Sequence, residues 1–268
     1  MFSKRTTILF YPDVTKFGFV AYRLCRFLRY RITNDPTQQY DVAFKRKDGT
    51  RTDPAALNDL PMDVDRIINS RSHDISKNRV DAVQEEVFSY PTAVDPTTHQ
   101  GEALKKSDEN ALRDCEIITC PIPEDSVDPD YVYQKLINNE TGDDQTLDYR
   151  VTIIGNQIPA VVLKYHPLKR KRFVDISGAD LATADSVFND EEQAKILEFA
   201  RAMGIDFGEF DVLRDVDDDR IYIVDTNNTP YGPTGKLGWF GRRAALKLMA
   251  PAFRDLIDRF RLGETETS

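Results

Sequence analysis

The chain has 268 residues, of which 40% are hydrophobic and 30% charged, as in a globular protein of one large or two small domains. Its net charge of −9 speaks against a nucleic-acid partner, and no apolar run is long enough to span a membrane, so we expect neither partner. Three cysteines (Cys25, Cys115 and Cys120) show no metal-ligand spacing and are odd in number, which indicates a reducing, cytoplasmic location.

The first part of the chain predicts a small α/β layer. Residues 6–11 (TTILFY) form an apolar run typical of a buried strand, and residues 40–44 (YDVAF) predict a second strand. Between them, residues 16–30 place their apolar side chains on one helical face. This strand–helix–strand order favours parallel strands. Three arginines on the other faces of the helix fit a solvated surface or, alternatively, a docking site for an anionic membrane or substrate: Arg23, Arg26 and Arg29.

The rest of the chain alternates polar connections with predicted strands and helices. Residues 45–66 and 90–101 are polar and rich in turn residues, so we expect irregular connections there. Helices are predicted at residues 75–87, 190–203 (ended by Gly204) and 242–261, the last interrupted near Pro251. Strands are predicted at residues 103–106, 116–120 and 131–137, and as a hairpin at 149–154 and 158–165 around Gly155-Asn156.

The most informative segment is residues 208–233, GEFDVLRDVDDDRIYIVDTNNTPYGP, which predicts two short strands around an acidic turn at residues 217–219. With that turn, Asp211 lies directly opposite Asp225, and carboxylates opposed across a hairpin repel each other. A divalent cation would remove this cost, and Asn227 adds an oxygen on the same face. A one-residue change of register would separate the two aspartates, so a solvated acidic hairpin is the alternative.

This order of elements, with a final hairpin that carries D-x-N-x-x-P, resembles the ATP-grasp superfamily of D-alanine–D-alanine ligases, glutathione synthetases and RimK-like enzymes. The resemblance covers about residues 75–233. It implies an α/β (α+β) fold in which an N-terminal strand–helix–strand layer precedes two α+β lobes that clasp a nucleotide. It also implies ATP and Mg²⁺ as cofactors, with Asp211, Asp225 and Asn227 as the metal ligands and Pro230 as the motif's proline.

Further positions match the family in the same order. Lys77 and Lys106 fit its two phosphate-binding lysines, although Lys105 could replace Lys106, and Ser107 to Asp114 would be the phosphate-covering loop without its usual glycines. Four residues match the adenine hinge, Q-x-x-I: Gln134, Lys135, Leu136 and Ile137.

The family's D-x-R strand matches Asp148 to Arg150, and Lys164 matches the basic residue of the returning strand. By resemblance, Arg150 and Lys164 are the catalytic residues that touch the transferred phosphoryl group or the substrate. An arginine on a sheet face is seldom buried alone, so either an anionic ligand or a carboxylate must meet Arg150.

The leading functional hypothesis is an ATP-dependent carboxylate–amine or carboxylate–thiol ligase that acts through an acylphosphate. The alternative is a kinase that phosphorylates a hydroxyl of an anionic acceptor, for which Glu209 is a candidate base. A non-catalytic nucleotide-binding module is the third hypothesis. The expected partner is an anionic small-molecule substrate, and a homodimer is left open.

The predicted domains are an N-terminal α/β domain (1–74), an ATP-grasp domain (75–262) and a disordered tail (263–268). His166 and the basic run 169–172 follow the Lys164 strand and could recruit an anionic substrate or form a solvated loop. Trp239 and Phe240 fit packing for the last helix, with a substrate platform as the alternative.

Overall fold

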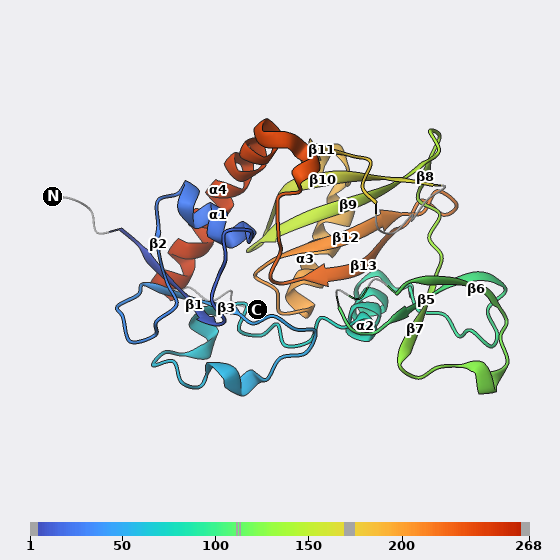
Figure 1. Ribbon diagram of the computed structural model, residues 1–268, viewed down its shortest axis with the longest axis horizontal. Helices are drawn as coiled ribbons and strands as arrows, with labels where there is room; N and C mark the ends of the chain where they lie inside the picture. Colours follow the sequence, from blue (N-terminus) through green and yellow to red (C-terminus); the bar gives the residue numbers. More distant parts are fainter. Residues whose placement is uncertain (1–4, 111, 113, 169–174, 264–268) are drawn as a thin grey trace.

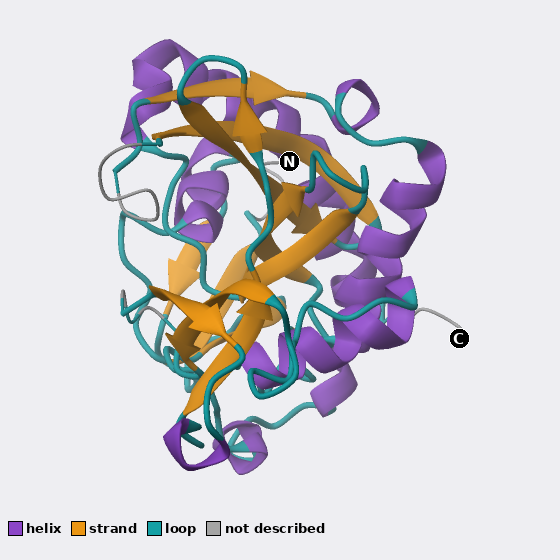
Figure 2. Ribbon diagram, turned by 90° about the vertical axis from the view of Figure 1, so that its right-hand side faces the viewer, coloured by secondary structure: helices purple, strands orange, loops and turns teal. Residues whose placement is uncertain are grey.

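The computed structural model describes residues 5–110, 112, 114–168 and 175–263 (Figure 1). Its strands form three sheets, with the helices placed around them (Figure 2). Among the described helices, none combines the length and the apolar character that a membrane span requires.

The N-terminal sheet has the strand order β2-β1-β3-β4, and all neighbouring strands are parallel. The predicted parallel strand–helix–strand layer is therefore confirmed. Its elements are β1 (Thr7–Pro12), α1 (Val20–Phe27), β2 (Arg31–Thr33), β3 (Val42–Arg46) and β4 (Ile67–Ile68).

Helix α1 is shorter than the helix predicted at residues 16–30. Phe19 is extended, with φ −73° and ψ 141°, and its backbone forms a bridge with Tyr231. The amide of Val20 also donates to the carbonyl of Pro230 at 3.0 Å. These contacts with a segment some 210 residues away hold the backbone extended, so the helical periodicity of residues 16–19 does not decide the conformation.

A small antiparallel sheet of order β6-β5-β7 lies beside helix α2, at the right of Figure 1. Its strands agree with the predicted segments, apart from residues 136–137, which lie beyond the end of the last strand. The elements are α2 (Lys77–Phe88), β5 (Gly101–Ser107), β6 (Glu116–Cys120) and β7 (Tyr131–Lys135).

The large sheet has the order β11-β10-β9-β12-β13, with the short β8 paired to β9, and all its pairs are antiparallel. Both predicted hairpins belong to it. The elements are β8 (Glu140–Thr141), β9 (Gln145–Ile154), β10 (Gln157–Pro167), β11 (Gly178–Ala182), α3 (Asp190–Ala202), β12 (Phe207–Arg214) and β13 (Ile221–Asn227).

The two faces of the large sheet have opposite characters. Apolar residues at alternate positions, such as Val151, Phe210 and Ile223, pack with α2 and α3 in one buried cluster. Polar residues at the intervening positions, such as Arg150 and Asp211, turn to the other face and line a pocket. This alternation is what a sheet with one face on the core requires.

Helix α4 (Gly238–Leu262) closes the fold and packs against α1. The break predicted near Pro251 is wrong, because the helix runs through this residue, which lies on the exposed side. Residues from α4, α1 and the N-terminal sheet share one apolar cluster with Phe207 of the large sheet. The division at residues 74 and 75 stays a prediction, since packing continues across it.

Candidate functional site

A pocket of about 500 Å³ lies between the large and the small sheet, a volume in the range of ligand sites. Strands β9, β10, β12 and β13 line one side, and β5, β7 and the start of α2 line the other. The pocket gathers all eleven residues to which the sequence assigned metal, nucleotide or catalytic roles, roles that stay predictions. They are Lys77, Lys106, Gln134, Lys135, Leu136, Ile137, Arg150, Lys164, Asp211, Asp225 and Asn227.

A β-bulge in strand β13 turns Asp225 into this pocket. Val212 pairs with Ile223 and Asp211 pairs with Asp225, so Val224 is an extra residue in the ladder. Without it, Asp225 would share a face with Ile223, which is buried against the helices. Bulges commonly re-aim a side chain beside an active site. Here the bulge brings the two aspartates opposite each other on the pocket side.

Basic side chains neutralise Asp211. Its carboxylate lies 3.0 Å from Arg150 Nη1 and 2.9 Å from Lys164 Nζ. Burial alone would raise the pKa of Asp211, but the nearby positive charges of Arg150 and Lys164 lower it overall. Arg150 Nε also donates to Glu209 at 2.7 Å, so its guanidinium bridges two carboxylates. The sequence left open whether a ligand or a carboxylate meets Arg150, and in this structure two carboxylates do.

Asp225 is met by a different cation. Lys77 Nζ, at the start of α2, lies 2.6 Å from Asp225 and also donates to the side chain of Asn110 at 3.2 Å. Lys106 Nζ donates to the carbonyl of Val224, the bulged residue, at 3.1 Å. Burial, and then the positive charge of Lys77, lower the pKa of Lys106. The two lysines therefore hold the bulge from the small-sheet side of the pocket.

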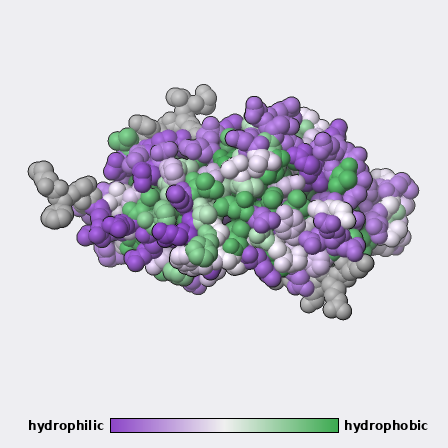
Figure 3. Space-filling model, turned by 90° about the horizontal axis from the view of Figure 1, so that it is seen from above, coloured by the Kyte–Doolittle hydropathy of each residue, from purple (hydrophilic) through white to green (hydrophobic). Residues whose placement is uncertain are grey.

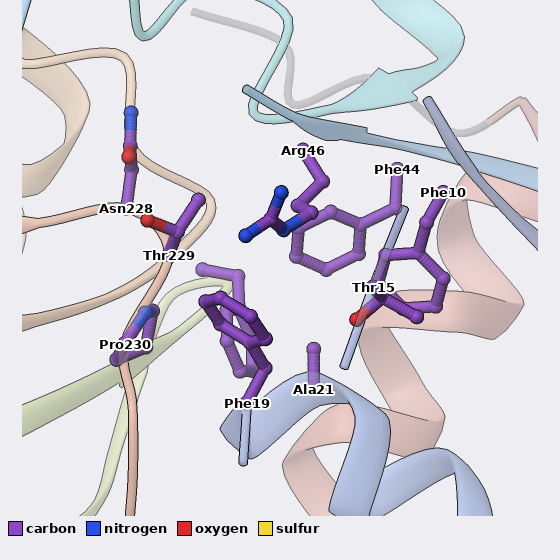
Figure 4. Close-up of a pocket in the computed structure, with 10 residues that line it drawn as sticks. Phe10, Thr15, Phe19, Ala21, Phe44, Arg46, Asn228, Thr229 and Pro230 are labelled. Carbon is purple, nitrogen blue, oxygen red and sulfur yellow. The ribbon is translucent and has the colours of Figure 1, made fainter. Parts of the chain in front are cut away.

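A second, much smaller cavity lies between the N-terminal layer and the segment after Asn227 (Figure 4). The guanidinium of Arg46 stacks on Phe19 at 4.3 Å and points into it, near Thr15 and Asn228. Its volume for a water-sized group is about 10 Å³, room for about one water. Of these two cavities, the larger pocket is therefore the one with room for a ligand of nucleotide size.

No family model and no curated protein matches the chain by sequence, whereas solved structures match nearly all of it. The ATP-grasp ligase PsnB, complexed with a minimal precursor, is 14% identical with a TM-score of 0.61, over 96% of this chain and 99% of that one. D-alanine–D-alanine ligase from Bacillus anthracis is 13% identical with a TM-score of 0.56, over 97% and 100%. The macrocyclase MdnC from Microcystis aeruginosa, bound with precursor peptide MdnA, is 12% identical with a TM-score of 0.53, over 95% and 99%. This chain has the ATP-grasp fold.

The side chains of the first two residues of the predicted adenine hinge have partners within the protein. The Gln134 amide donates to Asp81 of α2, and burial raises the pKa of that carboxyl to about 7. Lys135 Nζ lies 2.6 Å from Asp215 and 3.0 Å from Asp218. Leu136 and Ile137 follow directly and line the pocket. This segment thus offers the pocket apolar surface from Leu136 and Ile137, rather than free polar groups from the two preceding residues.

The chemistry of the donor set fits Mg²⁺. Asp211 and Asp225 supply carboxylates and Asn227 supplies an amide oxygen, which are the oxygen ligands this ion takes. The Asn227 oxygen accepts from the Thr229 amide at 2.8 Å, and a carbonyl oxygen has a second lone pair. Among the described residues no group of three or more His, Cys, Asp or Glu has metal-binding geometry. The fit therefore rests on this mixed set, in which cations now neutralise the carboxylates.

Two further pocket residues form a pair whose role the sequence left undefined. His166 Nε2 lies 3.0 Å from the carboxylate of Asp148, and His166 is buried. The other oxygen of Asp148 accepts from the Asn139 side chain at 2.9 Å. Strand alternation could have found the pair, because Asp148 shares a face with Arg150 and His166 shares one with Lys164.

Some predictions fall outside the described residues. The basic run 169–172 lies wholly outside them, as does the tail after Gly263. Residues 111 and 113 of the predicted phosphate-covering loop also lie outside. The described start of that loop is close to the site, where the Asn110 side chain donates to the carbonyl of Thr226 at 3.3 Å.

Proposed function

We propose that the protein is an ATP- and Mg²⁺-dependent ligase that joins a carboxylate to an amine or a thiol through an acylphosphate. The observation that carries the proposal is the bulge, which places Asp225 opposite Asp211, with Asn227 two residues on, in the lining of a ligand-sized pocket. The ATP-grasp ligases among the similar structures support it, as do their complexes with ATP, or with Mg and ADP.

The pocket suggests how a nucleotide would lie. Its cations gather near the two aspartates, where Lys77 and Lys106 would act as point charges on the phosphates. The base would lie toward Leu136 and Ile137, which offer apolar surface. Mg²⁺ held by Asp211, Asp225 and Asn227 would neutralise charge on the phosphate oxygens.

The proposed chemistry has two steps. A substrate carboxylate oxygen attacks the γ-phosphorus of ATP, the bond to the bridging oxygen breaks, and ADP leaves. An amine or thiol then attacks the acyl carbon, phosphate leaves with the carbon–oxygen electron pair, and the nucleophile loses a proton. Arg150 and Lys164 would stabilise the negative charge that develops at the transferred group. No protein nucleophile is required.

The kinase alternative requires a base near the metal acids, and Glu209 was the candidate. Glu209 is buried and its carboxylate binds Arg150, so it is held as an ion-pair partner. This arrangement favours the ligase over the kinase. The third hypothesis, a non-catalytic module, would give nucleotide binding without turnover.

The similar structures suggest a substrate class. Several similar structures were solved with precursor peptides, namely PsnB and MdnC. We extend the proposal to a carboxylate that belongs either to an anionic small molecule or to a peptide side chain.

Trapping with hydroxylamine tests the reaction type. The protein is incubated with ATP, Mg²⁺, hydroxylamine and a panel of amino acids, dicarboxylates and acidic peptides. A ligase yields a hydroxamate together with ADP and free phosphate, and Lys164→Gln abolishes the product whereas the surface variant Lys195→Gln does not. A phosphorylated product without hydroxamate or free phosphate would instead establish the kinase.

A further inference from the structure

Positive charge is concentrated in two stretches of an otherwise acidic chain. Residues 14–34 and 226–254 contain no aspartate or glutamate, and each contains five lysines or arginines. The remaining sequence has 26 basic against 45 acidic residues, a charge of −19, whereas these stretches together carry +10. The ten cations are Lys16, Arg23, Arg26, Arg29, Arg31, Lys236, Arg242, Arg243, Lys247 and Arg254.

The fold brings the two stretches together. Helices α1 and α4 pack side by side (Figure 1), and the guanidinium of Arg243 lies 6.0 Å from the centre of the Phe27 ring. The loops before these helices are also joined, since Gly232 donates its amide to the carbonyl of Gly18 at 3.1 Å. The charges of two distant sequence segments therefore lie on one side of the molecule.

Large aromatic side chains are exposed in the same two stretches. Phe17 is 72% exposed, Trp239 62% and Phe240 81%. The Trp239 and Phe240 rings pack edge to face at 4.9 Å, and Arg23 lies over the Phe17 ring at 5.1 Å. Seen from the α4 side, apolar residues reach the surface between polar ones (Figure 3). Of the two interpretations of Trp239 and Phe240, packing under the last helix does not hold, because both rings face outward.

Within the described residues, the cations of these stretches have no carboxylate partners. Across the described parts of the chain, none of the ten forms an ion pair within 4 Å of a carboxylate. Elsewhere, Arg51, Arg150 and Arg214 each pair with one or more acidic side chains. The positive charge on the α1–α4 side is thus available to a partner.

We infer that this surface binds an acidic polypeptide segment that also carries apolar side chains. We call it the α1–α4 face and define it by Phe17, Arg23, Arg26, Phe27, Trp239, Phe240, Arg243 and Lys247. Charge complementarity favours an anionic partner, and the exposed rings provide anchors of the kind that dominate protein interfaces.

The kind of cation favours a polypeptide over a lipid surface. Seven of the ten are arginines and three are lysines, and they lie beside exposed Trp and Phe; protein–protein interfaces are enriched in Arg, Trp and Phe and depleted in Lys. The inference goes beyond the proposed ligase activity and does not depend on it, because binding is measured without nucleotide or turnover.

Trp239 provides a direct readout, since it is the only tryptophan of the chain. The probe is a short synthetic peptide of glutamate and aspartate interspersed with leucine and phenylalanine. The control peptide has glutamine and asparagine in place of the acids. We expect the acidic peptide to shift the Trp239 emission to shorter wavelength, with an affinity that falls as salt is raised, and the control peptide to leave the emission unchanged.

Charge reversal on the face provides the second arm. Arg26→Glu with Arg243→Glu should weaken binding about tenfold or more, because two attractive contacts become repulsive. The matched variant, Lys195→Glu with Arg261→Glu, makes the same charge change outside the face and should bind as the wild type does. Circular dichroism confirms that both variants are folded.

Three results would overturn the inference. They are equal binding of the acidic and the amide peptides, equal affinities of the two double variants, and no binding of the acidic peptide even at low salt. A shift of Trp239 emission with phosphatidylserine vesicles, in the absence of any peptide response, would assign the face to a membrane surface instead. None of these results bears on nucleotide binding in the pocket.

Discussion

The pocket and the α1–α4 face both concentrate charge, but only the pocket pairs it. In the pocket, Arg150 bridges Glu209 and Asp211, and Lys77 meets Asp225. On the α1–α4 face, cations such as Arg26 and Arg243 lie among exposed aromatic rings without carboxylate partners among the described residues. Buried charges must be neutralised within the fold, whereas exposed ones need not be. The pocket's charges should therefore affect stability, and those of the face should affect only binding.

The largest expected effect comes from removing the central cation of the pocket. Arg150→Met leaves the carboxylates of Glu209 and Asp211 without their shared partner, and should lower the free energy of unfolding by about 3 kcal/mol. Urea unfolding measures the loss. Arg26→Met, the same change on the α1–α4 face, is the control and should leave stability nearly unchanged. Equal losses in the two variants would remove the distinction between the regions.

Acid should weaken the pocket through Asp211. Its pKa is lowered in the folded state, so its ion pairs contribute fully above the ordinary carboxyl pKa, and this contribution is lost as the pH falls below that value toward the lowered folded-state pKa. We expect Asp211→Asn to abolish about 2 kcal/mol of this acid-sensitive stability. Unfolding free energies between about pH 6 and pH 2 test it, and an unchanged slope in the variant would show that other groups dominate.

Asp81 should have the opposite pH dependence. Burial raises its pKa to about 7, so the folded protein binds more protons than the unfolded chain between about pH 4 and 7. Its contribution is fully present below about pH 4 and is lost as the pH rises through about 7. Asp81→Asn keeps an acceptor for Gln134 and should stabilise the protein at pH 8 by about 1 kcal/mol. Destabilisation at pH 8 would mean that the charged carboxylate is needed there.

The smallest expected effect on stability comes from the α1–α4 face. Arg26→Glu with Arg243→Glu should change the free energy of unfolding by less than about 0.5 kcal/mol, since both side chains are exposed. Thermal unfolding of this variant beside the wild type provides the measurement. A large loss of unfolding free energy would show that these arginines stabilise the fold.

The sequence predicted the correct pairing of the two aspartates in the hairpin, but the prediction did not include the bulge. Counting outward from a turn at 217–219 put Asp211 opposite Asp225, and the structure has this pair. Arg214 nevertheless pairs with Ile221, so counting from the observed ladder near the turn would put Asp211 opposite Val224. The bulge at Val224 corrects the register. No residue pattern in the hairpin predicts this bulge, because contacts with other parts of the fold stabilise it.

Most helices and strands were predicted from local sequence patterns, because apolar alternation and helix caps are properties of a few neighbouring residues. The start of α1 was missed because Phe19 pairs with Tyr231. The partners of Arg150 were missed for a similar reason, since Glu209 lies on another strand. The eleven predicted site residues gather in one pocket, but which of them neutralise one another is set by the sheet order.

The central claim is that the bulged hairpin binds a nucleotide through Mg²⁺. Calorimetric titration of ADP with and without Mg²⁺ tests it most directly, on the wild type, Asp225→Asn and the exposed control Asp255→Asn. We expect Mg²⁺-dependent binding that is lost in Asp225→Asn and kept in Asp255→Asn. Binding that does not need Mg²⁺, or that survives Asp225→Asn, would contradict the claim, as would a folded wild type that binds no ADP at all.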